Sequence, residues 1–236
     1  MKYKNVVFDL YGTLVDIRTD ENPLTFWQQV AGFLSAFNAD WQPEELHQAY
    51  LAKVSRELSK YSQNSYPDID VRIVFNYLIQ VKGGKATQSQ IDELAINFRK
   101  ASTLFIKLYD GVEELLNWLQ ETGINIFLLS NAQSCFTLPE LESLGIKQYF
   151  KEIYISSDYH TSKPDSGFFE LLPVNKEETV MIGNDWFNDI EGAVNYGIDA
   201  IYIHQAISPP VSGPLRSVYN VMDGDVNKLT AYLKSL

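Results

Sequence analysis

The sequence predicts an α/β protein, in which a Rossmann-like parallel sheet carries an inserted bundle of four helices. Two observations lead to this fold class. Short apolar runs of strand length alternate with helical segments at the start of the chain and again after residue 108, whereas residues 22–108 are almost wholly helical in periodicity. Repeated strand–helix units form parallel sheets with right-handed crossovers. We therefore expect a core of residues 1–16 and 109–236, interrupted by a helical insertion of residues 17–108.

The first expected element is a buried strand and tight turn within residues 4–15, in which an apolar run leads directly to Asp9. Four helices follow. Asn22 and Pro23 have the pattern of an N-cap and a first helical residue. A second helix is expected over residues 43–60. A third ends at a pair of glycines at residues 83–84, and Thr87 with Gln90 has the spacing of a capping box that begins the fourth.

Strands and helices alternate in the remainder of the chain. Asp110 is expected to cap a helix that ends at Gly123. Apolar runs predict strands at residues 124–129, 152–156, 179–182 and 200–204, and residues 229–236 are expected to form a closing helix.

The charge and cysteine content of the chain limit the partners and the compartment that we expect for it. The 236 residues carry a formal net charge of −11, which argues against nucleic acid and anionic membrane surfaces as partners. Cys135 is the single cysteine, so a reducing compartment is expected, and no apolar run approaches membrane-spanning length. The chain starts directly in a strand without a signal-peptide pattern. We expect a cytoplasmic protein, either a monomer or a homodimer.

Asp9 and Lys163 are the candidate catalytic residues. A carboxylate at the carboxyl end of a buried strand lies where open α/β sheets bind ligands, and it can attack phosphorus or an activated carbon to form a covalent intermediate. The ammonium of Lys163, held extended before a proline, can neutralise that carboxylate and a phosphoryl oxygen. The alternatives are a turn-forming aspartate and a surface lysine.

Uncharged hydrogen-bond donors lie close to these candidate residues or in other loops of the sequence. Thr13, Ser130 and Asn131 can hold phosphoryl oxygens, and Gly12 allows the chain to turn closely beneath a ligand. Alternatively, Asn131 starts the next helix.

Two further acids suggest a metal. Asp185 and Asp189 lie four residues apart after a predicted strand. Together with Asp9 and the backbone of Tyr11, these hard oxygen donors suit octahedral Mg²⁺. The alternative for Asp189 is the N-cap of a helix over residues 190–196.

Four motifs in order, over nearly the whole chain, resemble the haloacid dehalogenase (HAD) superfamily with a helical C1 cap. They are Asp9-Leu10-Tyr11-Gly12-Thr13, Ser130-Asn131, Lys163-Pro164-Asp165 and Gly183-Asn184-Asp185-Trp186-Phe187-Asn188-Asp189. The resemblance implies a hydrolase in which Asp9 is the nucleophile and the inserted helices choose the substrate.

The chain departs from the phosphatase pattern of that superfamily at two positions. Phosphatases carry a second Asp where this chain has Tyr11, and dehalogenases carry Tyr there. Many members place an acid directly after the motif-four glycine, where this chain has Asn184, so assigning Asp185 as the ligand assumes a shift of one residue. A phenol with a pKa near about 10 is a poor replacement for a carboxylate as a base, although Tyr11 remains a candidate catalytic residue. An aromatic residue here can also simply pack against the cap.

The acidic pair favours a Mg²⁺-dependent phosphatase that acts on a small phosphorylated metabolite through an aspartyl-phosphate. Two alternatives stay open. Tyr11 favours a metal-free 2-haloacid dehalogenase, and the missing acid also allows a catalytically weak, phosphate-binding regulatory module.

Other polar and aromatic residues receive structural interpretations. Arg18 and Arg72 are candidates for binding a second anionic group, with a surface position favoured for both. Aromatic residues of the insertion are expected to form the core of the bundle. The three histidines, His47, His160 and His204, lack the spacing of metal ligands.

Overall fold

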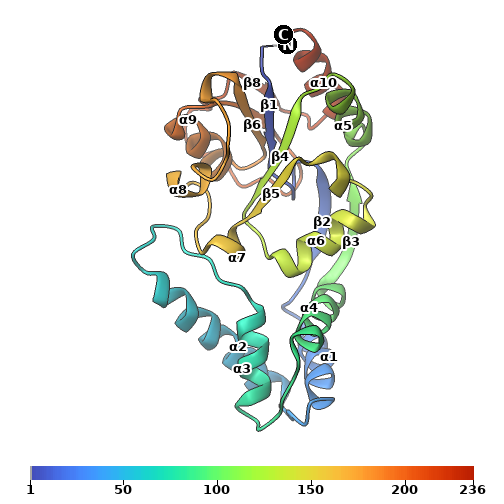
Figure 1. Ribbon diagram of the computed structural model, residues 1–236. Coiled ribbons are helices and arrows are strands. Elements are labelled where there is room, and N and C mark those ends of the chain that lie inside the picture. Colours follow the sequence, from blue (N-terminus) through green and yellow to red (C-terminus); the bar gives the residue numbers. More distant parts are fainter. Residues whose placement is uncertain (1) are drawn as a thin grey trace.

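A six-stranded parallel sheet forms the centre of the molecule. The computed structural model describes residues 2–236, and the strand order is β5-β4-β1-β6-β7-β8 (Figure 1). The strands are β1 (Asn5–Phe8), β4 (Asn125–Ser130), β5 (Glu152–Ile155), β6 (Thr179–Gly183), β7 (Asp199–Ile203) and β8 (Tyr219–Val221). The predicted α/β fold class is confirmed. The short edge strand β8 was not predicted, because three residues give too brief an alternation to recognise.

Helices cover both faces of this sheet, and alternate residues of each strand face opposite layers. Val6 and Phe8 pack in the cluster that contains Leu115 and Leu229, whereas Val7 packs in the cluster that contains Phe168. The helices of this part are α5 (Val112–Glu121), α6 (Ser134–Ser143), α7 (Ser156–Tyr159), α8 (Ser166–Phe169), α9 (Gly192–Tyr196) and α10 (Val226–Lys234). Short 3₁₀ turns occupy Ser59–Tyr61, Lys147–Tyr149 and Lys176–Glu178, and a π-helical turn occupies Trp186–Glu191.

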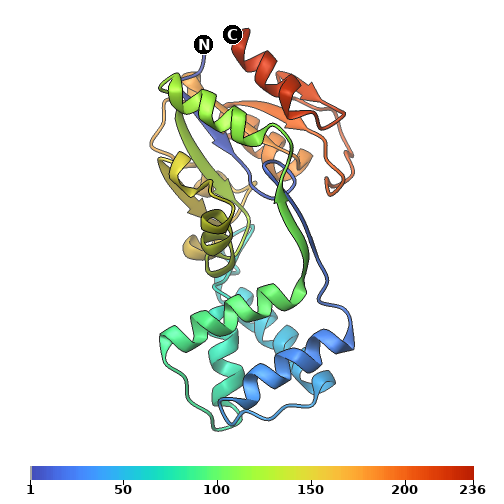
Figure 2. The same cartoon turned by 90° about the vertical axis from the view of Figure 1, so that its right-hand side faces the viewer.

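The insertion forms a separate bundle of four helices below the sheet in Figures 1 and 2. These are α1 (Leu24–Ser35), α2 (Pro43–Leu58), α3 (Arg72–Gln80) and α4 (Gln88–Ser102). Its core is aromatic, as expected: the ring of Phe98 contacts those of Phe26, Tyr50 and Phe75 with centroids 5.0–5.5 Å apart. Phe136 of α6 also belongs to this hydrophobic cluster.

Two antiparallel strands connect the bundle to the sheet, and the sequence did not predict them. β2 (Val15–Thr19) leads into the bundle and β3 (Thr103–Leu108) returns from it, side by side as one ribbon (Figure 2). Both are only five or six residues long and directly adjoin helical stretches, so their period-2 pattern is masked by the neighbouring helical periodicity. Arg18 lies on this ribbon and is exposed.

The helix-start predictions had mixed outcomes. The Thr87–Gln90 capping box is present at α4. The predictions for Asn22 and Asp110 were wrong. Pro23 occupies the N-cap position of α1, while the Asn22 side chain donates to Asp20 Oδ1. Gly111, with a φ of +87°, occupies the N-cap position of α5, since this left-handed turn suits glycine better than aspartate.

The strands of the sheet point their carboxyl ends toward the bundle (Figure 1). Ligand-binding crevices of open α/β sheets lie beyond these ends. Within residues 2–236, no helix combines the length and the apolar character that crossing a membrane requires.

Candidate active site

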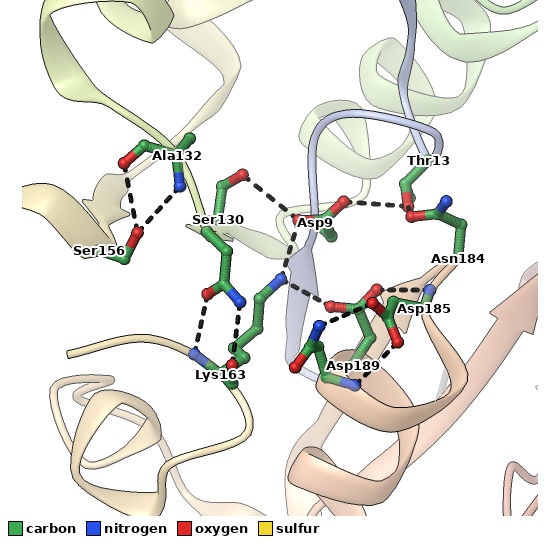
Figure 3. A network of polar contacts seen from close by, with 11 residues as sticks. Asp9, Thr13, Ser130, Ala132, Ser156, Lys163, Asn184, Asp185 and Asp189 are labelled. Carbon is green, nitrogen blue, oxygen red and sulfur yellow. Dashed lines mark hydrogen bonds and ion pairs between the residues drawn. The ribbon is translucent and has the colours of Figure 1, made fainter. Parts of the chain in front are cut away.

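The predicted catalytic residues meet at the carboxyl ends of three neighbouring strands. Asp9 follows β1, Ser130 ends β4 and Asn184 follows β6, and Lys163 reaches them from the loop between α7 and α8 (Figure 3). They line one cavity, whose walls are Asp9, Tyr11, Ser130, Asn131, Lys163, Asn184, Asp185, Asn188, Asp189, Ile207 and Pro209.

The ammonium of Lys163 lies between two carboxylates. Its Nζ donates to Asp9 Oδ1 at 2.8 Å and to Asp189 Oδ1 at 2.6 Å, and all three residues are buried. Burial alone would lower the pKa of Lys163, but the two carboxylates raise it above its usual value. Burial raises the pKa of Asp189 to about 7, although the Lys163 ammonium opposes this effect. Lys163 is therefore held protonated beside Asp9, and its interpretation as a surface lysine was wrong.

Asn131 holds the backbone of Lys163. Its Nδ2 donates to the Lys163 carbonyl oxygen at 2.9 Å, and its Oδ1 accepts from the Lys163 N–H at 2.8 Å. It does not start the next helix, because α6 begins at Ser134 with Gln133 at its N-cap position. The side chain thus fixes the loop that carries the ammonium.

Hydroxyl groups contact both oxygens of Asp9. Ser130 Oγ donates to Asp9 Oδ1 at 3.3 Å, and Thr13 Oγ1 lies 3.4 Å from Asp9 Oδ2. The same Thr13 hydroxyl is 3.4 Å from Asn184 Oδ1. Gly12 has a φ of +83°, and a Cβ there would overlap the Asn184 amide, so glycine is what lets this turn approach Asn184.

Asp185 points into its own turn. Its Oδ1 accepts from the N–H groups of Phe187 and Asn188 at 2.9 and 3.0 Å, and its Oδ2 accepts from Asn188 Nδ2 at 2.7 Å. Asp185 is therefore the N-cap of the π-helical turn, and Asp189 lies within that turn rather than at the N-cap of a helix over residues 190–196. The Asp189 Oδ2 accepts from the Asp185 N–H at 2.9 Å.

The predicted metal ligands are consequently not gathered around one point. Among residues 2–236, no group of three or more His, Cys, Asp and Glu side chains is arranged to hold a metal ion. The oxygens that do face each other across the Thr13 hydroxyl are Asp9 Oδ2 and Asn184 Oδ1. Mg²⁺ is commonly bound by one or two carboxylates together with waters and substrate phosphate oxygens. This smaller donor set fits Mg²⁺, and the sequence interpretation overlooked the amide oxygen of Asn184.

The Tyr11 hydroxyl is hydrogen-bonded to α6 and not to Asp9. It donates to Glu140 Oε2 and lies 3.1 Å from Thr137 Oγ1, both on α6. Arg99 of α4 donates to Glu140 Oε1 at 2.7 Å and lies over the Tyr11 ring at 5.4 Å. Burial, followed by the nearby Glu140 carboxylate, raises the Tyr11 pKa above its usual value. The structure thus brings the hydroxyl to α6 rather than to the cavity.

The family model for haloacid dehalogenase-like hydrolases matches residues 6–203. This chain belongs to that family. The pyrimidine 5'-nucleotidase PynA of Streptococcus pneumoniae is 27% identical to this hydrolase over 234 residues, which cover 94% of each protein.

Two solved structures show the same fold over nearly the whole chain. A HAD phosphatase from Thermococcus onnurineus has a TM-score of 0.61 at 21% identity and covers 98% of this hydrolase and 97% of its own chain. A 2-haloacid dehalogenase from Pseudomonas syringae pv. Tomato DC3000 has a TM-score of 0.67 at 20% identity and covers 99% of both chains.

In this hydrolase a loop of the insertion, residues 61–71, is docked on the loops around the cavity. Asp68 Oδ2 accepts from Ser156 Oγ at 2.5 Å, and the Val71 N–H donates to Gln133 Oε1 at 2.8 Å. The Tyr66 carbonyl oxygen accepts from the N–H of Ser162, the neighbour of Lys163, at 2.9 Å. The sequence offered no signal for these contacts, since they join residues 62 to 96 positions apart.

The remaining candidates have structural partners. Arg72 pairs with Asp70 and Asp92 within its own bundle rather than facing the cavity. The ring of His47 stacks on Trp27 and that of His160 on Tyr61, and Nδ1 of His204 lies 2.9 Å from the Tyr202 hydroxyl.

Proposed function

We propose that this hydrolase is a Mg²⁺-dependent phosphatase that acts on a small phosphorylated metabolite through an aspartyl-phosphate at Asp9. The observation that carries the proposal is the buried Asp9 carboxylate, one oxygen of which is held by Lys163 and Ser130 while the other faces the cavity beside Thr13. This arrangement places Asp9 Oδ1 beside the Lys163 ammonium for attack on phosphorus and leaves Oδ2 beside Thr13 for a cation.

In the proposed reaction Asp9 Oδ1 forms a bond to phosphorus as the bond to the leaving oxygen breaks, and water later opens the acyl phosphate. Lys163 neutralises charge that develops on the phosphoryl oxygens, and Thr13, Ser130 and the turn at Gly12 supply neutral contacts. Asn131 orients the lysine, and Asp189 balances its charge.

Mg²⁺ would be held by Asp9 Oδ2, Asn184 Oδ1 and the backbone carbonyl of Tyr11. When bound, it would supply positive charge that stabilises the phosphoryl oxygens. This assignment replaces Asp185, whose oxygens are engaged within its own turn.

The insertion, residues 17–108, is proposed as a helical C1 cap that selects the leaving group. The docked loop at residues 61–71 supports this role, because it covers the loop that carries Lys163. Nucleoside 5'-monophosphates are the first substrates to screen, since PynA is named for activity on pyrimidine 5'-nucleotides. We further propose a cytoplasmic location, consistent with a single, unpaired Cys135.

The nucleophile is tested with Asp9→Asn, assayed with p-nitrophenyl phosphate in Mg²⁺. We expect turnover to fall below detection, whereas the same exchange at the exposed Asp223, which pairs with nearby Lys228, should leave it unchanged. Undiminished hydrolysis by the Asp9 variant would refute the proposal.

A metal-free 2-haloacid dehalogenase is the second candidate. Two observations favour it: Tyr11 in the nucleophile turn and a neutral Asn184 where an acidic ligand is common. Halide release from 2-chloropropionate that persists in a chelator would establish this activity. A third outcome, Mg²⁺-dependent phosphate binding without turnover of any substrate, would indicate a regulatory module instead.

A further inference from the structure

The Asn184 side chain brings an uncharged amide oxygen to the part of the cavity where Asp9 Oδ2 and the Tyr11 carbonyl would bind a cation. We propose that this hydrolase holds a divalent cation firmly only together with a phosphoryl group, and that Asn184 imposes this dependence. The inference rests on the proposed function, because it assigns the cation and the phosphoryl group to the Asp9 cavity.

The side chain of Asn184 is buried between two hydroxyl groups. It is 4% exposed, its Nδ2 donates to Ser208 Oγ at 3.3 Å, and its Oδ1 lies 3.4 Å from Thr13 Oγ1. Ser208 is itself held, since its Oγ accepts from the Gln205 N–H at 2.9 Å. In this arrangement the amide oxygen lies toward Thr13 and the amide nitrogen toward Ser208.

The other two acids of the turn are engaged by protein donors. Asp185 Oδ1 caps the π-helical turn, and its Oδ2 accepts from Asn188 Nδ2. Asp189 uses one oxygen for Lys163 and the other for the Asp185 N–H. Asp9 Oδ2 is the carboxylate oxygen that remains next to Asn184, with the Thr13 hydroxyl as its neighbour.

The net charge of the buried groups couples the binding of the cation to the binding of the phosphoryl group. At pH 8 one ammonium, Lys163, faces the two carboxylates of Asp9 and Asp189, which leaves a single net negative charge. A divalent cation alone would reverse that charge, and a phosphate dianion alone would increase it. Unbalanced charge is strongly disfavoured away from water. Bound together, the cation and the dianion restore the original balance.

Isothermal titration calorimetry of the full chain at pH 8 tests this coupling. MgCl₂ is titrated with and without inorganic phosphate, and phosphate is titrated with and without MgCl₂. We expect each ligand to tighten the other by the same factor, about 5- to 150-fold, because coupling between two binding equilibria is reciprocal. Equal Mg²⁺ affinity in the two buffers would overturn the proposal, as would the absence of Mg²⁺ binding in both.

Asn184→Asp identifies the residue responsible. The added carboxylate should tighten Mg²⁺ binding without phosphate by about tenfold or more, because ligand charge sets cation affinity, and should bring the coupling factor toward one. Asn195→Asp adds the same charge on an exposed part of α9 and should reproduce wild-type binding. An Asn184→Asp variant that binds Mg²⁺ like the wild type would overturn the assignment.

Asn184→Leu keeps a similar volume but removes the oxygen, and it should weaken Mg²⁺ binding in the presence of phosphate. Circular dichroism of each variant establishes that it is folded; unchanged Mg²⁺ binding by a folded Asn184→Leu variant would also count against the proposal. The outcome is separable from that of the phosphatase proposal. Turnover in Mg²⁺ without coupling leaves the phosphatase and removes this inference, whereas coupling without turnover does the reverse.

Discussion

Lys163, Asp9 and Asp189 form a buried charge cluster in which each group depends on the others. The lysine touches both carboxylates, and Asn131 fixes its backbone. Removing one member of a buried ion pair is strongly destabilising because the remaining charge is left without a partner. At the scale of single residues, the geometry of the cavity therefore rests on the side chains that position this cluster.

Gly183 is one such residue, although it has no side chain. A Cβ at this position would overlap the Asp189 carboxylate. We expect Gly183→Ala to displace Asp189 from Lys163 and to lower the free energy of unfolding by about 1–3 kcal/mol, measured by urea denaturation. Gly32→Ala is the control. It lies in α1 with open space around it and should stabilise by about 0.5–1 kcal/mol. Equal effects of the two changes would contradict the packing argument.

Tyr11 offers a second test at the same scale. Its hydroxyl contacts Glu140 and Thr137 and not Asp9. Tyr11→Phe should thus lower the free energy of unfolding by about 0.5–1.5 kcal/mol, the usual worth of a hydrogen bond, and leave turnover of p-nitrophenyl phosphate within a few-fold of wild type. A loss of about 10²- to 10⁴-fold in kcat would instead identify the phenol as a general acid.

Individual elements of the insertion hold the cavity loops through specific contacts. The loop at residues 61–71 reaches Gln133, Ser156 and Ser162, and α4 reaches α6 through the Arg99–Glu140 ion pair. Because these contacts are hydrogen bonds and an ion pair, their contribution to docking is expected to respond to charge and pH.

Replacing Asp68 allows the response of the docked loop to pH to be measured. Burial raises its pKa above the ordinary value, so the folded protein disfavours its charged form. The contribution of Asp68 to stability is fully present below its unfolded pKa and is lost as the pH rises through its folded pKa. Relative to Asp68→Asn, wild type should therefore become more stable as the pH falls from 7 toward 4, as measured by thermal unfolding.

The control for this prediction is Asp223→Asn, which should show the opposite trend. A hydrogen bond from Lys228 lowers the Asp223 pKa, so the contribution of this acid is lost as the pH falls. A difference between wild type and Asp68→Asn that does not change with pH would show that Asp68 is not held in a desolvated position.

At the scale of the whole molecule, the hydrophobic residues form separate cores. Two clusters lie on opposite faces of the sheet, and a third fills the helical bundle with Phe136 as its contribution from α6. The β2–β3 ribbon connects the two parts. Separate cores allow the bundle to open without disrupting the sheet.

Phe75→Ala tests this independence. Phe75 is fully buried in the bundle, and its truncation should lower stability by about 3–5 kcal/mol. We expect hydrogen–deuterium exchange, followed by mass spectrometry, to increase mainly within residues 24–102. Phe127→Ala, at an equally buried site in the sheet, should instead increase exchange in the strands. Uniform loss of protection in the Phe75 variant would indicate a single cooperative unit.

Local patterns in the sequence were sufficient for most of the fold and for several of the residues in the cavity. The apolar strand before Asp9, the helical periodicity predicted for residues 22–108, of which 103–108 proved to be a strand, and the Thr87–Gln90 capping box depend on neighbours within a few positions. The β2–β3 ribbon was not predicted because its paired residues are 84 to 93 positions apart in the sequence, and short strands beside helices have no distinctive period.

The sequence by itself determined that Asp9, Thr13, Ser130 and Lys163 would stand at strand ends or adjoining loops, since each position follows from local hydrophobic pattern and motif. Only the tertiary structure decided which hydrogen-bond partners the neighbouring polar side chains take. It turned Asp185 into its own helix cap, Tyr11 toward Glu140, and the amide oxygen of Asn184 toward Thr13. The physical reason is that a polar side chain takes the partner that folding brings within hydrogen-bonding distance, and that partner is distant in sequence for two of these three residues.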